Sequence, residues 1–270
     1  WDWGTPWYRP TRVIHSVTGG EYGWRSGTSK WPSSFEDSLP ATIDIGIGSP
    51  TGVCFGYGTK FPARYQKALY VMDWSYGRIV AVHLMPDGAS YFASKETFVR
   101  GKPLNVSDME VGPDGALYFV VGGRGTQSGL YRVTYVGDEP TAKVSYVSKE
   151  EADARLLRQK LESFHGKPNP EAIAFTWPHL RSPDRWIRYA ARVALESQPV
   201  SQWGGRVIDE YSVQGSLTGL MALARIGEKH WQDLLLAKLQ EIVTPDLPEE
   251  QQMQVVRILQ LSFIRMGKPS

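Results

Sequence analysis

ALYVMDWSYGRIVAV, at residues 68–82, returns 48 residues later as ALYFVVGGRGTQSGLYRV, at residues 116–133. Each copy contains a β-rich run, a polar or glycine-containing turn and a second β-rich run, which is the pattern of a β-hairpin. The turn VGPDG at residues 111–115 introduces the second copy. A barrel or a sandwich also repeats hairpins, but a spacing of about 40–50 residues is typical of four-stranded propeller blades. The repeat therefore predicts a β-propeller.

The composition changes near Val136. Upstream, short alternating runs rich in Gly, Pro, Trp, Tyr and Val predict strands, whereas downstream a period near 3.6 in Ala, Leu, Arg and Glu predicts helices. We expect a multidomain chain, β then α. Residues 1–137 would form a partial antiparallel β-propeller of two to three four-stranded blades, and residues 150–270 an α-helical domain. Residues 138–149 are interpreted as a linker or a last outer strand, with KVSYV at residues 143–147 as the candidate strand.

The helical half contains one well-specified helix, in SPDRWIRYAARVALE. Ser182 is its predicted N-cap, and Pro183 suits the first helical position. The pattern from Asp184 to Leu195, D-x-x-I-R-x-x-A-x-x-A-L, resembles the second helix of HEAT-type repeats. Further apolar stripes follow at residues 217–227 and 255–267, a spacing that fits stacked helical pairs. We expect a HEAT-like solenoid, and a generic helical bundle is the alternative.

Charge and cysteine content exclude several classes of function. The 30 basic and 28 acidic residues give a net charge of +2 without long like-charge runs, so we expect no nucleic-acid partner. Cys54 is the only cysteine, so the chain has no intrachain disulfide and no C-x-x-C-H motif for haem. No apolar run is long enough for a transmembrane segment.

The expected blade geometry brings several loops to one rim. In an up-and-down blade, the approach to the first strand and the turn between the second and third strands lie at the same end. Loops on one rim are a usual place for a binding site. The candidate residues there are Asp73, Trp74, Tyr76, Lys102, Asn105, Asp108, Arg124 and Gln127. Trp74 or Tyr76 would supply a stacking surface. The alternative is that these residues only form turns and pack.

Three stretches carry a family resemblance: GGEYGWRSG at residues 19–27, SPTGVCFGYGTKFPARYQKALYVMDWSYGRIVAVHL at 49–84, and SDMEVGPDGALYFVV at 107–121. Together they resemble the later blades of the soluble glucose/sorbosone dehydrogenase family. The resemblance implies a six-bladed β-propeller that uses pyrroloquinoline quinone (PQQ) and calcium to oxidise sugar hydroxyl groups. If the rim binds such a cofactor, the candidate cofactor-binding residues among those that the blade geometry brings together are Asp73, Trp74, Tyr76, Lys102, Asp108 and Arg124.

The chain departs from the family at the positions that would hold PQQ. Ser75 stands where the family has a lysine, and Asn105 and Ser107 stand where it has two arginines. Each missing cation removes a charge-assisted contact to an anionic cofactor, worth about 1.5–3 kcal/mol. The family's catalytic histidine belongs to earlier blades, upstream of Trp1, so the catalytic residues of this chain stay unknown.

The resemblance also places a calcium loop at the start of the chain. WDWGTPWYRP, at residues 1–10, occupies the corresponding position, so the candidate metal ligands are Asp2, Gly4 and Thr5. A Gly-Pro turn without metal is the alternative.

Two classes of function follow. Propeller blades before HEAT-like helices resemble large exported planctomycete and verrucomicrobial proteins of the membrane-bound dehydrogenase type, which often end in a cytochrome c domain. The first hypothesis is therefore a fragment of a PQQ-dependent sugar or alcohol dehydrogenase, periplasmic or secreted, inactive without its missing upstream blades. The second is a non-catalytic propeller and solenoid that binds carbohydrate or protein partners.

Overall fold

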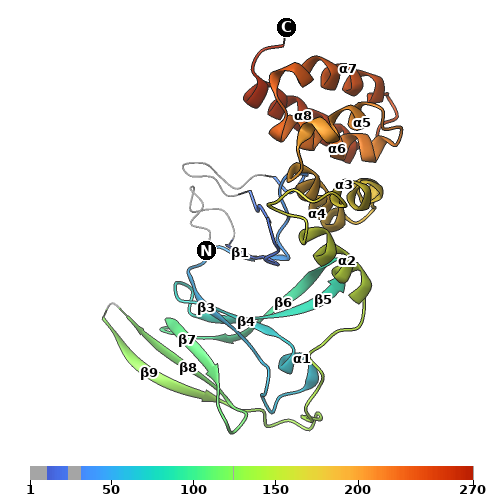
Figure 1. Ribbon diagram of the computed structural model, residues 1–270. Helices are drawn as coiled ribbons and strands as arrows, with labels where there is room; N and C mark the ends of the chain where they lie inside the picture. Colours follow the sequence, from blue (N-terminus) through green and yellow to red (C-terminus); the bar gives the residue numbers. More distant parts are fainter. Residues whose placement is uncertain (1–10, 24–31, 124, 270) are drawn as a thin grey trace.

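The computed structural model describes residues 11–23, 32–123 and 125–269. Strands fill the first half of the described chain and helices the second, and the helices stack upward from one end of the sheets (Figure 1). Nine strands form three antiparallel sheets in the described residues. Their strands are β1 (Thr11–Val13) and β2 (Ile43–Gly46) in the first; β3 (Pro50–Phe55), β4 (Leu69–Asp73), β5 (Arg78–Asp87) and β6 (Ser90–Arg100) in the second; and β7 (Val106–Val111), β8 (Leu117–Gly123) and β9 (Thr126–Val133) in the third.

The four-stranded sheet β3–β6 lies between the other two sheets. Alternate residues of its strands point to opposite faces, so each face packs against one of the neighbouring sheets. One face carries Tyr70, Met72 and Ile79, which share a core with Leu117 and Phe119 of the three-stranded sheet. The other face forms a smaller core with the two-stranded sheet, consisting of Ile45, Leu69, Val71, Val80 and Val82. The two central strands are therefore apolar on both faces, which is why β4 and the start of β5 read as nearly continuous hydrophobic runs, whereas β3 and β6 at the edges alternate.

The helical half contains seven α-helices in its described residues. They are α2 (Ala152–Glu162), α3 (Ala172–Thr176), α4 (Arg185–Glu196), α5 (Gly204–Ile208), α6 (Val213–Ile226), α7 (Gln232–Ile242) and α8 (Glu249–Met266), with 3₁₀ turns at Trp177–Arg181, Val200–Gln202 and Lys229–Trp231. A large apolar core runs through them, centred on α4 and α6, and a small second cluster joins Phe164, Ala172 and Ala194. The N-cap of α4 is Asp184, and the predicted Ser182 lies two residues earlier, with its Oγ accepting from the Asp184 amide.

The helices are fastened to the sheets at the β5–β6 turn. Gly88 has a φ of +52°, and a Cβ there would lie 2.2 Å from Oδ2 of Asp184. The amide of Ala89 donates to the same Oδ2 atom at 2.6 Å, and Nε of Arg158 in α2 donates to the carbonyl of Ala89 at 2.9 Å. The second oxygen of Asp184 caps α4 by accepting from the amide of Trp186. One carboxylate therefore joins a β-turn to a helix start.

The predicted fold class, a partial propeller followed by a HEAT-like solenoid, is wrong. The described strands form separate sheets of two, four and three strands, and only β3–β6 has the four strands of a blade. The candidate fourth strand at residues 143–147 does not pair with β9, because Gln66 and Gly58 hold this stretch elsewhere. The helices do not repeat at a constant length either: α3 and α5 have five residues each, whereas α8 has 18.

Helix α1 (Ala63–Gln66) organises the return of the chain from the last sheet to the helices. From β9 the chain runs past α1 and then up to α2 (Figure 1). Nε2 of the buried Gln66 donates to the carbonyl of Ala142 at 2.9 Å, and its Oε1 accepts from the amide of Val144 at 3.3 Å. The Gln66 side chain thus positions Ala142 and Val144 without any strand pairing.

Candidate functional site

The rim residue Asp73 is fully occupied within its own turn. Its Oδ1 accepts from the amides of Ser49 at 2.9 Å and Ser75 at 3.2 Å, and its Oδ2 accepts from Nε of Arg78 at 2.8 Å. The side chain is buried, with 1% of its surface exposed. Asp73 therefore stabilises the β4–β5 turn and offers no free oxygen to a cofactor.

The other described rim residues divide into packed and exposed ones. Trp74 donates from Nε1 to the carbonyl of Gly122 at 2.9 Å, which joins two sheets. Tyr76 is 52% exposed, with the guanidinium of Arg78 5.5 Å from its ring centre. Lys102 and Asp108 are exposed, and Oδ1 of Asp108 accepts from the amide of Met109. Arg124 lies outside the described residues, as do Asp2, Gly4 and Thr5.

Two of the described rim candidates, Asp73 and Trp74, have little left to offer PQQ or calcium, while Arg124, Asp2, Gly4 and Thr5 lie outside the described residues, so the cofactor hypothesis stays a prediction. Cofactor carboxylates need free cationic donors and calcium needs free oxygens, but the carboxylate of Asp73 and the indole N–H of Trp74 are already used inside the protein. Within residues 11–23, 32–123 and 125–269, His, Cys, Asp and Glu side chains form no group of three that could hold a metal ion. We derive no reaction step through either group.

A hollow on the β5–β6 hairpin brings His83 and Glu96 together. It has a volume of about 490 Å³ and is lined by Arg64, Lys67, His83, Leu84, Ser94, Lys95 and Glu96. Nε2 of His83 lies 2.9 Å from Oε1 of Glu96, and this hydrogen bond is the main reason that the pKa of Glu96 is lowered. Ser94 lies directly opposite His83 in the sheet, but no described hydrogen bond joins their side chains. The hollow therefore lacks an activated nucleophile among the described residues.

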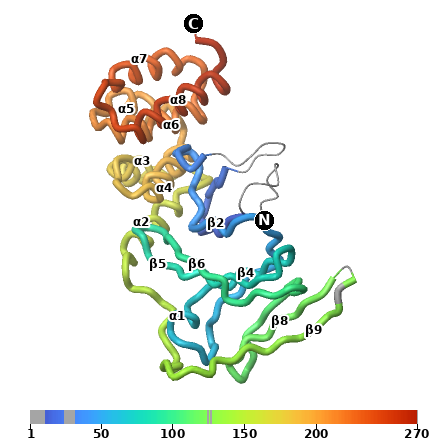
Figure 2. Tube along the Cα trace, turned by 180° about the vertical axis from the view of Figure 1, so that it is seen from behind, coloured from blue at the N-terminus to red at the C-terminus, as the bar shows by residue number. Residues whose placement is uncertain are grey.

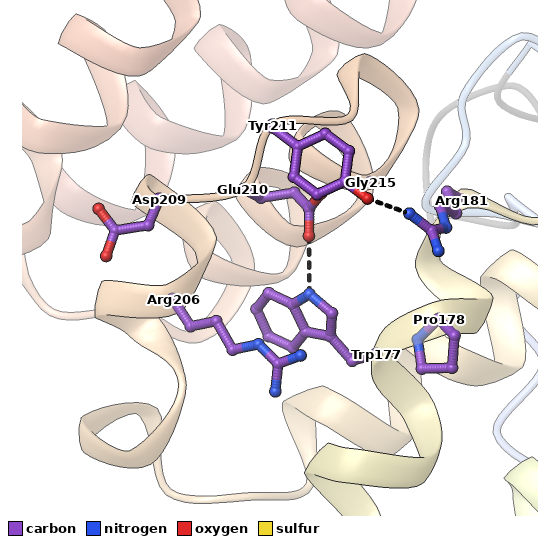
Figure 3. A pocket seen from close by; sticks show the side chains of 8 residues that line it. All are labelled: Trp177, Pro178, Arg181, Arg206, Asp209, Glu210, Tyr211 and Gly215. Atoms are coloured by element: carbon purple, nitrogen blue, oxygen red, sulfur yellow. Dashed lines mark hydrogen bonds between the residues drawn. The ribbon is translucent and has the colours of Figure 1, made fainter.

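A second hollow, of about 340 Å³, lies in the helical half (Figure 3). Nε1 of Trp177 donates to Oε2 of Glu210 at 2.7 Å, and the guanidinium of Arg206 lies 4.0 Å from the Trp177 ring centre. Arg181 donates to the hydroxyl of Tyr211 at 2.8 Å. Since the polar groups at both ends of this hollow are paired with each other, it is better suited to stiffening the junction between the 3₁₀ turn Trp177–Arg181 and the end of α5 than to holding a small ligand.

A third and larger hollow among the described residues lies beside the four-stranded sheet, and we call it the sheet cavity. Its volume is about 780 Å³, within the usual range for ligand pockets. One wall comes from β3–β5, one from the segment after β1, and one from residues 145–150. The lining residues are Val13, Ile14, His15, Ser16, Thr42, Val53, Phe55, Tyr57, Lys67, Leu69, Leu84, Met85, Pro86, Tyr91, Ser145, Tyr146, Val147, Ser148, Lys149 and Glu150.

Three stacked aromatic rings form one side of the sheet cavity. The ring of Tyr57 lies between those of Phe55, at a centroid distance of 4.6 Å, and Tyr146, at 4.1 Å. The interplanar angles are 10° and 26°, so the rings form a ladder. The Tyr146 hydroxyl accepts from the amide of Gly58 at 2.8 Å, which fixes the outermost ring. Burial raises the pKa of Tyr57, so its hydroxyl is neutral at physiological pH.

The opposite wall presents a neutral histidine. Burial, followed by the positive charges of Arg158 and Arg155, lowers the pKa of His15 to about 4. Its Nδ1 lies 2.9 Å from Oγ of Ser90. Ser90 is 1% exposed, so a ligand in the cavity does not reach it. His15 is therefore a neutral wall residue rather than half of a reactive pair.

No family model, curated protein or solved structure matches the chain. Among the described residues, no helix combines the length and the apolar character needed to cross a bilayer.

Sequence reasoning missed the sheet cavity. Phe55, Tyr57 and Tyr146 have no shared motif, and the last of them lies 89 residues beyond Tyr57. The available signal was local: alternation in β3 leaves Val53 and Phe55 on one face, followed by Tyr57. This pattern predicts an aromatic edge, but not the segment that covers it.

Proposed function

We propose that this chain is a carbohydrate-binding module whose ligand occupies the sheet cavity. The ladder of Phe55, Tyr57 and Tyr146 is the observation that carries the proposal. Sugar rings have apolar C–H faces that stack on aromatic rings, while their hydroxyls need polar partners, and tyrosine offers both surfaces. The cavity combines that ladder with the exposed amino groups of Lys67 and Lys149.

The lining supports binding rather than glycoside cleavage. Most glycosidases use two carboxyl groups on either side of the scissile bond. Glu150 is the only carboxylate in the described lining of the sheet cavity, and His15 is held neutral beside the buried Ser90. A periplasmic or secreted location, where polysaccharides are accessible, belongs to the same proposal.

The dehydrogenase hypothesis stays a prediction. The described rim offers it little support, since Asp73 and Trp74 use their polar atoms to hold turns. In the sheet cavity, by contrast, Lys67 and Lys149 are exposed, and Phe55 and Tyr57 keep 37% and 40% of their surface accessible although the faces of Tyr57 are covered by its neighbours.

Binding is tested by affinity electrophoresis on a panel of soluble polysaccharides, followed by calorimetric titration with oligosaccharides of the one that retards the chain. We expect Tyr57→Ala to weaken binding at least tenfold, which corresponds to about 1.4 kcal/mol, because it removes the central ring of the ladder.

The matched control is Tyr76→Ala. Tyr76 is an exposed tyrosine on the rim that the sequence favoured, so its replacement should leave the Kd within about twofold. If Tyr76→Ala abolishes binding and Tyr57→Ala does not, the ligand binds at the rim instead. If no carbohydrate on the panel binds, the proposal is rejected.

A further inference from the structure

Buried charges join the segment before β2 to three helices. Asp37 is fully buried, and its two oxygens accept from Nε and Nη2 of Arg257 in α8, each at 2.8 Å. Arg225 in α6 adds a contact to Asp37 at 3.1 Å and a second one to Glu196 in α4 at 2.9 Å. Glu196 also accepts from Arg192 in the same helix. Figure 2 shows this blue segment against the helices.

The same cluster contains more positive than negative side chains. Glu36 pairs with Arg188 at 3.2 Å and with Arg185 at 3.7 Å. Together, five arginines, Arg185, Arg188, Arg192, Arg225 and Arg257, meet three largely buried acids, Glu36, Asp37 and Glu196. Glu250 approaches Arg188 to 3.6 Å, but it is 68% exposed and its charge is weakened by water. We call this set the arginine cluster.

A small void lies inside the arginine cluster. It has a volume of about 10 Å³, room for about one water-sized particle. Its lining consists of Glu36, Arg188, Tyr189, Arg192, Leu217, Thr218, Met221 and Gln254.

The polar groups around the void are mostly unpaired donors. Nε of Arg188, Nε and Nη2 of Arg192, and Nε2 of Gln254 are buried without a hydrogen-bond partner. The side chains of Arg192 and Gln254 are 2% and 1% exposed. Buried N–H groups normally find acceptors, and guanidinium groups cannot accept from one another. The one carboxylate in the lining, Glu36, already pairs with Arg185 and Arg188, so the unpaired donors around the void have no charged acceptor of their own.

We propose that the void binds a chloride ion. A monatomic anion accepts from all the surrounding N–H groups at once and offsets the excess positive charge, whereas a water molecule leaves that charge in place. Phosphate, sulfate and the carboxylate of a partner protein are too large for a void of this size. The ion links α4 to α8 beside Glu36 and so holds the segment before β2 in place.

Crystals of the full chain soaked in sodium bromide provide the direct test. Bromide replaces chloride and scatters anomalously, so we expect an anomalous peak among Arg188, Arg192 and Gln254. Density without anomalous signal at that position would identify water and overturn the proposal.

Thermal unfolding provides the second test. In solutions of equal ionic strength, the Tm should be about 3 °C higher in 200 mM sodium chloride than in sodium gluconate, whose anion is too large for the void. The chloride effect should saturate with concentration. Equal Tm values in the two salts would contradict a bound ion.

The Gln254→Glu variant tests whether a carboxylate of the protein can replace the ion. The new carboxylate keeps the oxygen that accepts from Gln214 and places negative charge where the unpaired Nε2 lies. We expect the Tm in gluconate to rise and the difference between the salts to vanish. Gln240→Glu makes the same charge change at an exposed position of α7 and should keep the full chloride dependence. A chloride effect that survives in Gln254→Glu would place the ion elsewhere.

Discussion

The chain joins its parts in two physically different ways. The interface between sheets β3–β6 and β7–β9 is apolar, built from side chains such as Met72, Leu117 and Phe119. The arginine cluster is ionic and connects residues as far apart in the sequence as Asp37 and Arg257. Apolar burial is non-directional and tolerates small shifts, whereas each buried charge needs a partner at a defined distance. The first interface should therefore depend on volume, and the second on single atoms and on pH.

The largest effect is expected from breaking the ionic interface with Asp37→Asn. Loss of one partner leaves the buried Arg257 beside Arg225 without sufficient counter-charge, which should lower the free energy of unfolding by about 3–5 kcal/mol. Urea unfolding followed by tryptophan fluorescence measures this loss. Hydrogen exchange should speed up in α8 and remain unchanged in β7 and β8. An unaltered urea midpoint would mean that the carboxylate of Asp37 is not needed for stability.

A somewhat smaller effect is expected at the apolar interface from Leu117→Ala. The buried cavity left behind should lower the free energy of unfolding by about 2–4 kcal/mol. Because no charge changes, the loss should be the same in 0.1 M and 1 M salt. Leu130→Ala is the control, since Leu130 is 68% exposed and its loss should stay within about 0.5 kcal/mol. A salt-dependent loss in Leu117→Ala would contradict the distinction, because it would show that charges contribute to the stability of the apolar interface.

The smallest of these effects is the response to acid. Burial raises the pKa of Asp37, but the hydrogen bonds and charge of Arg257, with the charges of Arg192 and Arg225, bring it below its usual value of 3.8. The folded chain then binds this proton less tightly than the unfolded chain does. The ionised carboxylate of Asp37 therefore contributes its full stabilisation of the folded state above pH 3.8, and this contribution is lost as the pH falls through the lowered pKa of Asp37.

The stability gap between the wild type and Asp37→Asn should therefore narrow when urea unfolding is repeated at pH 5, 4 and 3. The gap between the wild type and Leu117→Ala is the reference and should stay constant. A constant gap for Asp37→Asn as well would show that its carboxylate carries no pH-dependent stability.

Local pattern was enough to predict many elements. The runs around Tyr70 and Phe119 alternate or are continuously apolar, and they became β4 and β8. The stripe around Ala191 became α4. The way in which these elements assemble could not be predicted from local pattern. A repeated hairpin indicates which strands are neighbours, but not how many strands each sheet contains or how the sheets pack against one another.

The sequence could not show how the rim residues are paired inside the protein, for a related reason. Aspartate is a residue type that often binds ligands, but the carboxylate of Asp73 already accepts from the amide of Ser49 and from the side chain of Arg78. Tyr57 belongs to no motif, and its partner Tyr146 is held by the amide of Gly58 and lies in a segment that Gln66 of α1 anchors at Ala142. Contacts made by one polar side chain between distant loops leave no periodic trace in a sequence.

The β5–β6 turn has a consequence for synthesis on the ribosome. Ala89 emerges 95 residues before its partner Asp184, and Asp37 emerges 220 residues before Arg257. At typical elongation rates these intervals last roughly 5–20 s and 11–44 s. The strands can pair during that wait, while the turn at Gly88 and the carboxylate of Asp37 stay hydrated. The strands thus have time to pair first, and the buried charges can close around them only once α8 has left the exit tunnel.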